Sequence, residues 1–342
     1  MTPAADAGSP IADERLPMRQ TVFFVRHAES RWNRAQADYA LMSMMWENDH
    51  GLTQEGRLQA EELRRRLRSA RECLEAGDVS RLGGEVEGKW LQQLVNPDAV
   101  FSSPFTRAVC TSCIALRDLV RRQVPMVLIK EARESKNFGG ADSTGVAVGE
   151  EIRDRVEEEL RALYEEEEAP LRDAALKDFS SLPLDVSDVS EPWWGGYLGD
   201  AEDHLNERVD ALMSRLRGTR GNLPCGGGST VLVGHSLFFR TVFARYLGGR
   251  DAAQSSPSVE ESLQQYVLPF CGVVGATLEW DEAGNCCIVD ARPLLGTQLK
   301  IPTMIAPPIS GDVGGVSPGP RPMRHAPLLC ACGRHGESCL PM

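Results

Sequence analysis

Apolar residues occur along this chain in short runs that are separated by amphipathic stretches. The runs TVFFV (21–25), AVF (99–101), MVLI (126–129) and TVLV (230–233) are rich in β-prone residues and show no polar alternation. Strands that are apolar on both faces belong inside a parallel sheet that helices cover on each side. We therefore predict an α/β fold, a three-layer α/β/α sandwich with a mainly parallel central sheet.

Amphipathic helices are predicted between these strands. In residues 54–71, Leu58, Leu63 and Leu67 stand among charged residues and predict one buried face. After the strand at 99–101, Ser103 is predicted to cap the next helix and Pro104 to be its first residue. Residues 150–170 predict an acidic helix that exposes its glutamates to solvent. Its buried stripe is predicted to consist of Ile152, Val156, Leu160 and Leu163.

Three stretches lack such periodicity. Residues 1–19, with their prolines, alanines and charges, are predicted to be a disordered leader, and residues 301–342 a disordered tail. Residues 169–200 are interpreted as an inserted loop or cap segment, a kind of segment that often shapes specificity. These boundaries leave one domain over residues 20–300.

Composition narrows the classes of function. The chain has 342 residues and an apolar fraction of 42%, ample for a buried core. A formal net charge of −12, with no long lysine-rich run, argues against a nucleic-acid partner. We find no apolar stretch suited to a signal peptide or a membrane span, and the ten scattered cysteines fit a reduced compartment, so we expect a cytoplasmic protein with no membrane partner.

The candidate chemistry lies where two apolar strands end in histidine. These residues are His27 and His235, and the carboxyl ends of parallel strands meet at one edge of a sheet. Arg26 adjoins His27, and Arg107 is expected in the first turn of a helix. A single buried histidine is usually a core residue, but two histidines and two arginines at one edge suit a tetrahedral dianion, because guanidinium groups match phosphate oxygens.

Four sequence elements then resemble a known family. RHAESRWN (26–33) is similar to an RHGExxxN signature, LTQEGRLQA (52–60) to LTxxGxxQA, SSPFTRA (102–108) to SSPxxRA, and VLVGHS (231–236) to the segment with the second histidine. In this order they resemble the histidine phosphatase superfamily, named for phosphoglycerate mutase. The resemblance implies a phosphoglycerate mutase-like fold and covers about residues 21–250.

The resemblance also implies roles for individual residues. It implies that His27 is the nucleophile that becomes phosphohistidine, that His235, Arg26 and Arg107 complete the phosphate pocket, and that Asn33 lies at its rim. Elementary chemistry agrees, because nearby cations disfavour protonation of an imidazole and leave a nitrogen available for attack. Arginines can also stabilise the transition state without a metal, so we expect neither a metal nor another cofactor.

The same reaction needs a carboxylic acid that protonates the leaving oxygen and then activates water. The family places this acid just after a later strand, and the segment LIKEARESKNFGG offers Glu131 and Glu134. We prefer Glu134, because ARE followed by a glycine-containing loop is closer to the family arrangement. Glu131 stays open, since the segment departs from the common LxExxxG spacing.

These residues favour a metal-independent phosphomonoester hydrolase acting on a phosphorylated small molecule or a phosphoprotein. A mutase is the nearest alternative, although MMWENDHGLT does not reproduce the sequence that dimeric and tetrameric mutases carry there. A phosphate-binding pseudoenzyme is the alternative from another class. The sequence leaves the substrate and the oligomeric state open.

Two further features are given plainer interpretations. The letters RHGES recur at 334–338 without a preceding apolar strand, and we interpret this repeat as coincidence. Trp193 and Trp194 are expected to be packing residues rather than a cover for substrate. The irregular spacing in the tail argues against a metal site made of Cys330, Cys332, His335 and Cys339.

Overall fold

The computed structural model describes residues 18–40, 47–135, 141–195, 200–218, 228–247 and 257–301. All of them fall in one compact unit, Met1–Ile305. The predicted tail lies outside the described residues apart from Ile301, and so does the predicted leader apart from Met18 and Arg19. The repeated RHGES letters and the cysteines of the tail also lie outside them.

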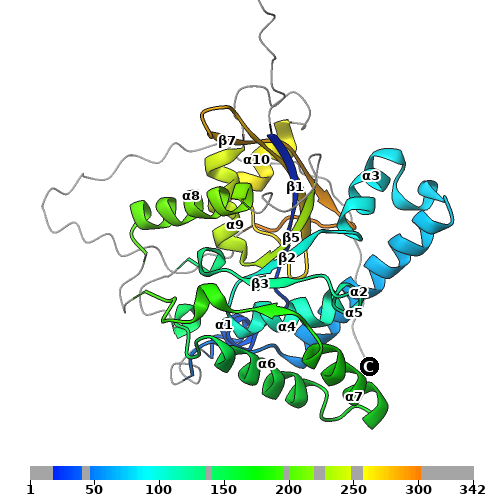
Figure 1. Ribbon diagram of the computed structural model, residues 1–342, viewed down its shortest axis with the longest axis vertical. Coiled ribbons are helices and arrows are strands. Elements are labelled where there is room, and N and C mark those ends of the chain that lie inside the picture. The colour runs from blue at the N-terminus through cyan, green and yellow to red at the C-terminus, as the bar shows by residue number, and fades with distance from the viewer. Residues whose placement is uncertain are drawn as a thin grey trace, which may run out of the picture. The chain divides into compact units, whose positions relative to one another are not determined.

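A seven-stranded sheet forms the centre of the fold, in the order β4-β3-β2-β5-β1-β6-β7. Neighbouring strands from β4 to β1 are parallel, whereas β6 and β7 are antiparallel additions at one side (Figure 1). The predicted mainly parallel α/β sheet is thus confirmed. The strands are β1 (Met18–Arg26), β2 (Ala99–Ser102), β3 (Met126–Leu128), β4 (Leu184–Asp185), β5 (Ser229–Gly234), β6 (Val273–Trp280) and β7 (Cys286–Leu294).

Helices cover both faces of the sheet. Alternate residues of β1 point to opposite faces, so Phe23 packs in a core with Trp90, whereas Phe24 packs in a second core with Phe239 and Phe243. This arrangement gives the predicted three layers. The helices are α1 (Arg31–Ala37), α2 (Gln54–Glu75), α3 (Glu85–Leu94), α4 (Thr106–Ala115), α5 (Arg117–Arg121), α6 (Glu150–Leu163), α7 (Ala169–Ser180), α8 (Glu202–Gly218), α9 (Ser236–Tyr246) and α10 (Pro257–Gln265), with 3-10 turns η2 (Val79–Leu82), η3 (Lys130–Ala132), η4 (Ala141–Ser143) and η5 (Ser187–Val189).

The start of α4 differs from the expectation. The helix begins at Thr106 rather than at Pro104, and Ser103 is not its cap. The carboxylate of Asp49 instead accepts hydrogen bonds from the backbone nitrogen of Thr106, at 2.8 Å, and from its hydroxyl, at 2.6 Å. A residue far away in the chain therefore satisfies the helix terminus, which local capping rules cannot anticipate.

The segment 169–200 is also more regular than expected. Helix α7 occupies its first part, and β4 pairs with β3 as a parallel edge strand, so this part is not an irregular loop. The helical signal is weak because only Ala175 and Phe179 of α7 are buried. Trp193 is buried and donates its indole N–H to the carbonyl of Ala147, as expected of a packing residue.

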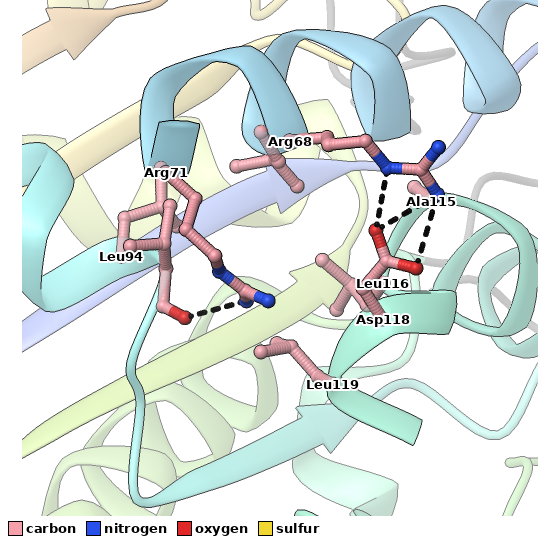
Figure 2. Close-up of a pocket in the computed structure, with 9 residues that line it drawn as sticks. Arg68, Arg71, Leu94, Ala115, Leu116, Asp118 and Leu119 are labelled. Carbon is pink, nitrogen blue, oxygen red and sulfur yellow. Dashed lines mark hydrogen bonds and ion pairs between the residues drawn. The ribbon is translucent and has the colours of Figure 1, made fainter. Parts of the chain in front are cut away.

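Two arginines of α2, Arg64 and Arg68, pair with Asp118 of α5. Figure 2 shows Arg68 reaching Asp118 of α5, with nitrogen–oxygen distances of 3.3 Å, above the apolar side chains of Leu116 and Leu119. In α2 itself, Leu58 is half exposed, contrary to expectation, while Leu63 is buried and Leu67 packs against the core.

In the part of the chain that the structure describes, no helix has both the length and the apolar character that a membrane crossing requires.

Candidate active site

The two strand-end histidines lie side by side. Strands β1 and β5 are parallel neighbours with Arg26 opposite Gly234, so the next residues of both strands, His27 and His235, emerge at the same edge. Their ring centroids are 4.9 Å apart in an edge-to-face arrangement, and both side chains are buried. The sheet register thus produces the convergence that the sequence predicts.

Both predicted arginines lie next to these histidines. Arg107, in the first turn of α4, is fully buried with its guanidinium 4.4 Å from the ring centroid of Phe105. Arg26 donates a 2.7 Å hydrogen bond to the carbonyl of Leu268 and lies 4.2 Å from the ring centroid of Phe270. The Nε atoms of both arginines are buried and lack an acceptor among the described residues. Buried cationic donors without an acceptor favour an anionic ligand.

The protonation of His27 follows from its backbone contact. Its Nδ1 lies 2.6 Å from the carbonyl oxygen of Ala28, and because a carbonyl can only accept, Nδ1 carries the proton. Nε2 therefore holds the lone pair. Burial lowers the pKa of His27 well below its ordinary value, and the charges of Arg107 and Arg26 lower it further, so the imidazole is neutral and nucleophilic near pH 7.

His235 is oriented by a serine of the SSP element. Its Nε2 lies 2.8 Å from the hydroxyl oxygen of Ser103, the residue that was expected to cap α4. Its Nδ1 lies 4.0 Å from a carboxylate oxygen of Glu134. Burial, and then the charge of Arg107, hold the pKa of His235 well below its ordinary value. Neutral His235 can therefore donate one hydrogen bond without adding charge.

Of the two candidate acids, the structure places Glu134 beside His235. One oxygen of Glu134 accepts hydrogen bonds from the backbone nitrogens of Ser135, at 2.8 Å, and Phe238, at 3.2 Å. Burial raises the pKa of this carboxyl, so it keeps its proton to a higher pH than an exposed glutamate does. Glu131 instead faces Arg215 of α8, at 3.5 Å.

Residues 22–76 match the family model described as the histidine phosphatase superfamily, branch 1. The predicted resemblance to this superfamily is confirmed. The matched segment includes Arg26, His27 and the LTQEGRLQA element, and it supports an enzyme of phosphoryl transfer in general. No curated protein matches the chain.

Solved structures of other proteins are also similar in chain course. A phosphoglycerate mutase from Bacillus anthracis str. Sterne is 14% identical, with 80% of this chain and 92% of that chain covered and a TM-score of 0.40. An ecdysone phosphate phosphatase from Bombix mori, in complex with tungstate, is 15% identical, with 87% and 96% covered and a TM-score of 0.41.

Asn33, which the resemblance to the histidine phosphatase superfamily places at the rim of the phosphate pocket, is hydrogen-bonded to Ser30 in this structure. Its side-chain oxygen accepts hydrogen bonds from the backbone nitrogen of Ser30, at 3.2 Å, and from the Ser30 hydroxyl, at 2.9 Å. The Ser30 hydroxyl in turn caps α1. These contacts explain the RHAESRWN spacing as a helix start, and the place of Asn33 at the rim of the phosphate pocket stays a prediction.

A second carboxyl group, which the sequence analysis missed, lies in the site beside Arg107. Asp142, in η4, faces Arg107 with nitrogen–oxygen distances of 3.2 and 3.4 Å, and lies 3.9 Å from Nδ1 of His50. Burial raises the pKa of Asp142 to about 7 despite Arg107. No motif marks this residue. Among the described residues, no group of three or more histidines, cysteines or carboxylates is arranged to hold a metal ion.

Proposed function

We propose that this protein is a metal-independent phosphomonoester hydrolase that acts through a phosphohistidine at Nε2 of His27. The observation that carries the proposal is the hydrogen bond from Nδ1 of His27 to the Ala28 carbonyl, because it leaves the Nε2 lone pair free beside the buried Arg107 and the partly buried Arg26. A neutral imidazole next to fixed cations is the combination that attack on a phosphoryl dianion requires.

The proposed first step transfers the phosphoryl group to the protein. The equatorial oxygens bind Arg26 and Arg107, and Nε2 of His27 forms a bond to phosphorus while the ester P–O bond breaks. Glu134 gives its proton to the leaving oxygen, consistent with its raised pKa. With Nε2 of His235 accepting from Ser103, its Nδ1–H is available to a phosphoryl oxygen.

The proposed second step returns the protein to its starting state. The carboxylate of Glu134 takes a proton from water, the resulting oxygen nucleophile attacks phosphorus, and the N–P bond to His27 breaks. Inorganic phosphate leaves, and Glu134 is again protonated. As substrate we propose a phosphorylated small molecule or a phosphoprotein in the cytoplasm, and the net charge of −12 makes nucleic acid an unfavourable partner.

One experiment tests this proposal. The purified protein, treated with a metal chelator, is assayed with an aryl phosphate from about pH 4 to about pH 8, and the acid-labile phosphoprotein is trapped by rapid quenching. We expect turnover that survives chelation, and a phosphohistidine that disappears in His27→Ala. Absence of hydrolysis, with retained binding of phosphate, would support the pseudoenzyme instead, whereas conversion of 3-phosphoglycerate to its 2-isomer would support a mutase.

A further inference from the structure

Asp142 faces the guanidinium of Arg107, one of the two arginines that we propose to bind the phosphoryl group. Both of its carboxylate oxygens face the two terminal nitrogens of that guanidinium, at 3.2 and 3.4 Å, and its side chain is 18% exposed. The Nη1 and Nε atoms of Arg107 make no well-aligned hydrogen bond to any described residue. A carboxylate and a phosphoryl dianion would therefore compete for the same donors.

The groups that face Asp142 come from every element around it. Arg107 belongs to α4, Arg26 ends β1 and Glu134 follows η3, and all three act on its charge. Asp49 and His50 come from the segment before α2. The charges of Glu134 and Asp49 add to the effect of burial in raising the pKa of Asp142. Asp142 is thus surrounded by two cations and two other carboxyl groups.

Charge balance limits how many of these carboxyl groups can be ionised together with a bound dianion. Asp49 is offset by Arg155, at 3.5 Å, and by two hydrogen bonds from Thr106. The charges of Glu134 and Asp142 are then left to be balanced by the positive charges of Arg26 and Arg107. If both were ionised, a phosphoryl dianion would add its charge to a buried site that is already neutral, which is strongly unfavourable.

We propose that Asp142 is a further residue of the phosphate site, which competes with the phosphoryl group for Arg107 and takes up a proton when a tetrahedral dianion binds. The raised pKa of Asp142, about 7, is consistent with a proton exchanged near neutral pH. This inference rests on the proposed function to the extent that both assign an oxyanion to Arg26 and Arg107. It does not require turnover.

The sign of the pH dependence follows from linkage. Because a dianion favours the protonated carboxyl, anion binding raises the pKa of Asp142, and Asp142 ionisation weakens anion binding by the same factor. Affinity for the anion should be nearly constant below the pKa of Asp142 and should fall by up to about tenfold for each pH unit above it. Binding in that range should take up close to one proton.

Sulfate is the probe that isolates this effect, because it remains a tetrahedral dianion throughout the titration, whereas phosphate changes its own charge. Its binding to the full chain is measured by calorimetry from about pH 6 to about pH 9, in buffers of different ionisation enthalpy to count protons. In the wild-type protein we expect the affinity to fall above about pH 7. In Asp142→Asn we expect a flatter profile and binding at least about tenfold tighter near pH 8.

Two variants serve as controls. Glu134→Gln removes a different carboxyl group from the same site. Because the charge of Glu134 raises the pKa of Asp142, this variant should keep the fall in affinity but begin it at a lower pH. Asp118→Asn, on α5, should behave as the wild-type protein. The inference is overturned if Asp142→Asn keeps the wild-type profile or binds sulfate more weakly near pH 8, or if the wild-type protein takes up no proton. A failure to trap phosphohistidine would refute the proposed hydrolase but would not affect the sulfate-binding measurement. The failure of the proposed function can therefore be told apart from the failure of the role proposed for Asp142.

Discussion

The hydroxyl of Ser103 lies 2.8 Å from Nε2 of His235 and joins the SSP element to the second histidine motif. Strands β2 and β5 are parallel neighbours, with Ser102 opposite Val233, so the residues that follow them meet at one sheet edge. The serine therefore belongs to the site. This contact explains why a residue that looks like a helix cap serves a different purpose here.

Ser103→Ala tests that contact. Without the hydroxyl, Nε2 of buried His235 loses its partner, so its ring orientation and tautomer are less restricted. We expect kcat/KM for an aryl phosphate to fall about tenfold, the equivalent of a hydrogen bond of about 1.4 kcal/mol. Ser102→Ala is the matched control, because that buried hydroxyl bonds the carbonyl of Ser103 instead. An equal loss of activity in both variants would show that the effect is one of packing.

Glu134→Gln tests the choice of the acid. The amide cannot protonate a leaving oxygen, so we expect hydrolysis of an alkyl phosphate, a poor leaving group, to slow by about a hundredfold or more. Hydrolysis of an aryl phosphate with a good leaving group should slow much less. Glu131→Gln is the control, because Glu131 faces Arg215. If Glu131→Gln shows the leaving-group dependence, the two assignments must be exchanged.

Arg208→Met tests how the acid is positioned. Arg208, in α8, donates to the backbone carbonyls of Glu131 and Arg133, which hold the turn immediately before Glu134. Its loss should reduce kcat for alkyl phosphates about tenfold, with a much smaller effect on KM. Arg245→Met, which removes a half-exposed ion pair with Asp210, should leave both constants unchanged. A uniform loss with all leaving groups would argue against positioning of the acid.

Asp142→Asn should also change stability in a pH-dependent way. When folding raises the pKa of an acid, the folded state is favoured most at a pH below the pKa that the acid has in the unfolded chain. This stabilisation is lost as the pH rises through the pKa that the acid has in the folded protein. Burial raises the pKa of Asp142 from 3.8 to about 7. Ionisation of Asp142 should thus lower the free energy of unfolding by on the order of 4 kcal/mol near pH 8. Near pH 4 this loss of stability should be almost absent.

Urea denaturation at those two pH values measures this difference. We expect Asp142→Asn to be more stable than the wild-type protein only at the higher pH, while Asp118→Asn should show no such gain. If Asp142→Asn is destabilised equally at both pH values, folding does not raise the pKa of Asp142 and this prediction is wrong.

The sequence by itself predicted the four buried strands β1, β2, β3 and β5 and the pair of histidines that follow two of them. Unbroken apolar runs can only be buried on both faces, and the carboxyl ends of parallel strands share an edge, so His27 and His235 had to emerge together once β1 and β5 were neighbours. Arg26 and Arg107 followed because each is attached to a predicted element.

Only the tertiary structure decided which carboxyl groups enter the site. Glu131 and Glu134 are so close in sequence that the path of one turn selects between them, and the carbonyl contacts of Arg208 hold that turn. Asp142 and Asp49 reach Arg107 and Thr106 across long stretches of sequence, from segments without periodicity. Such contacts depend on how separate elements pack, and local patterns of apolar and polar residues carry no information about them.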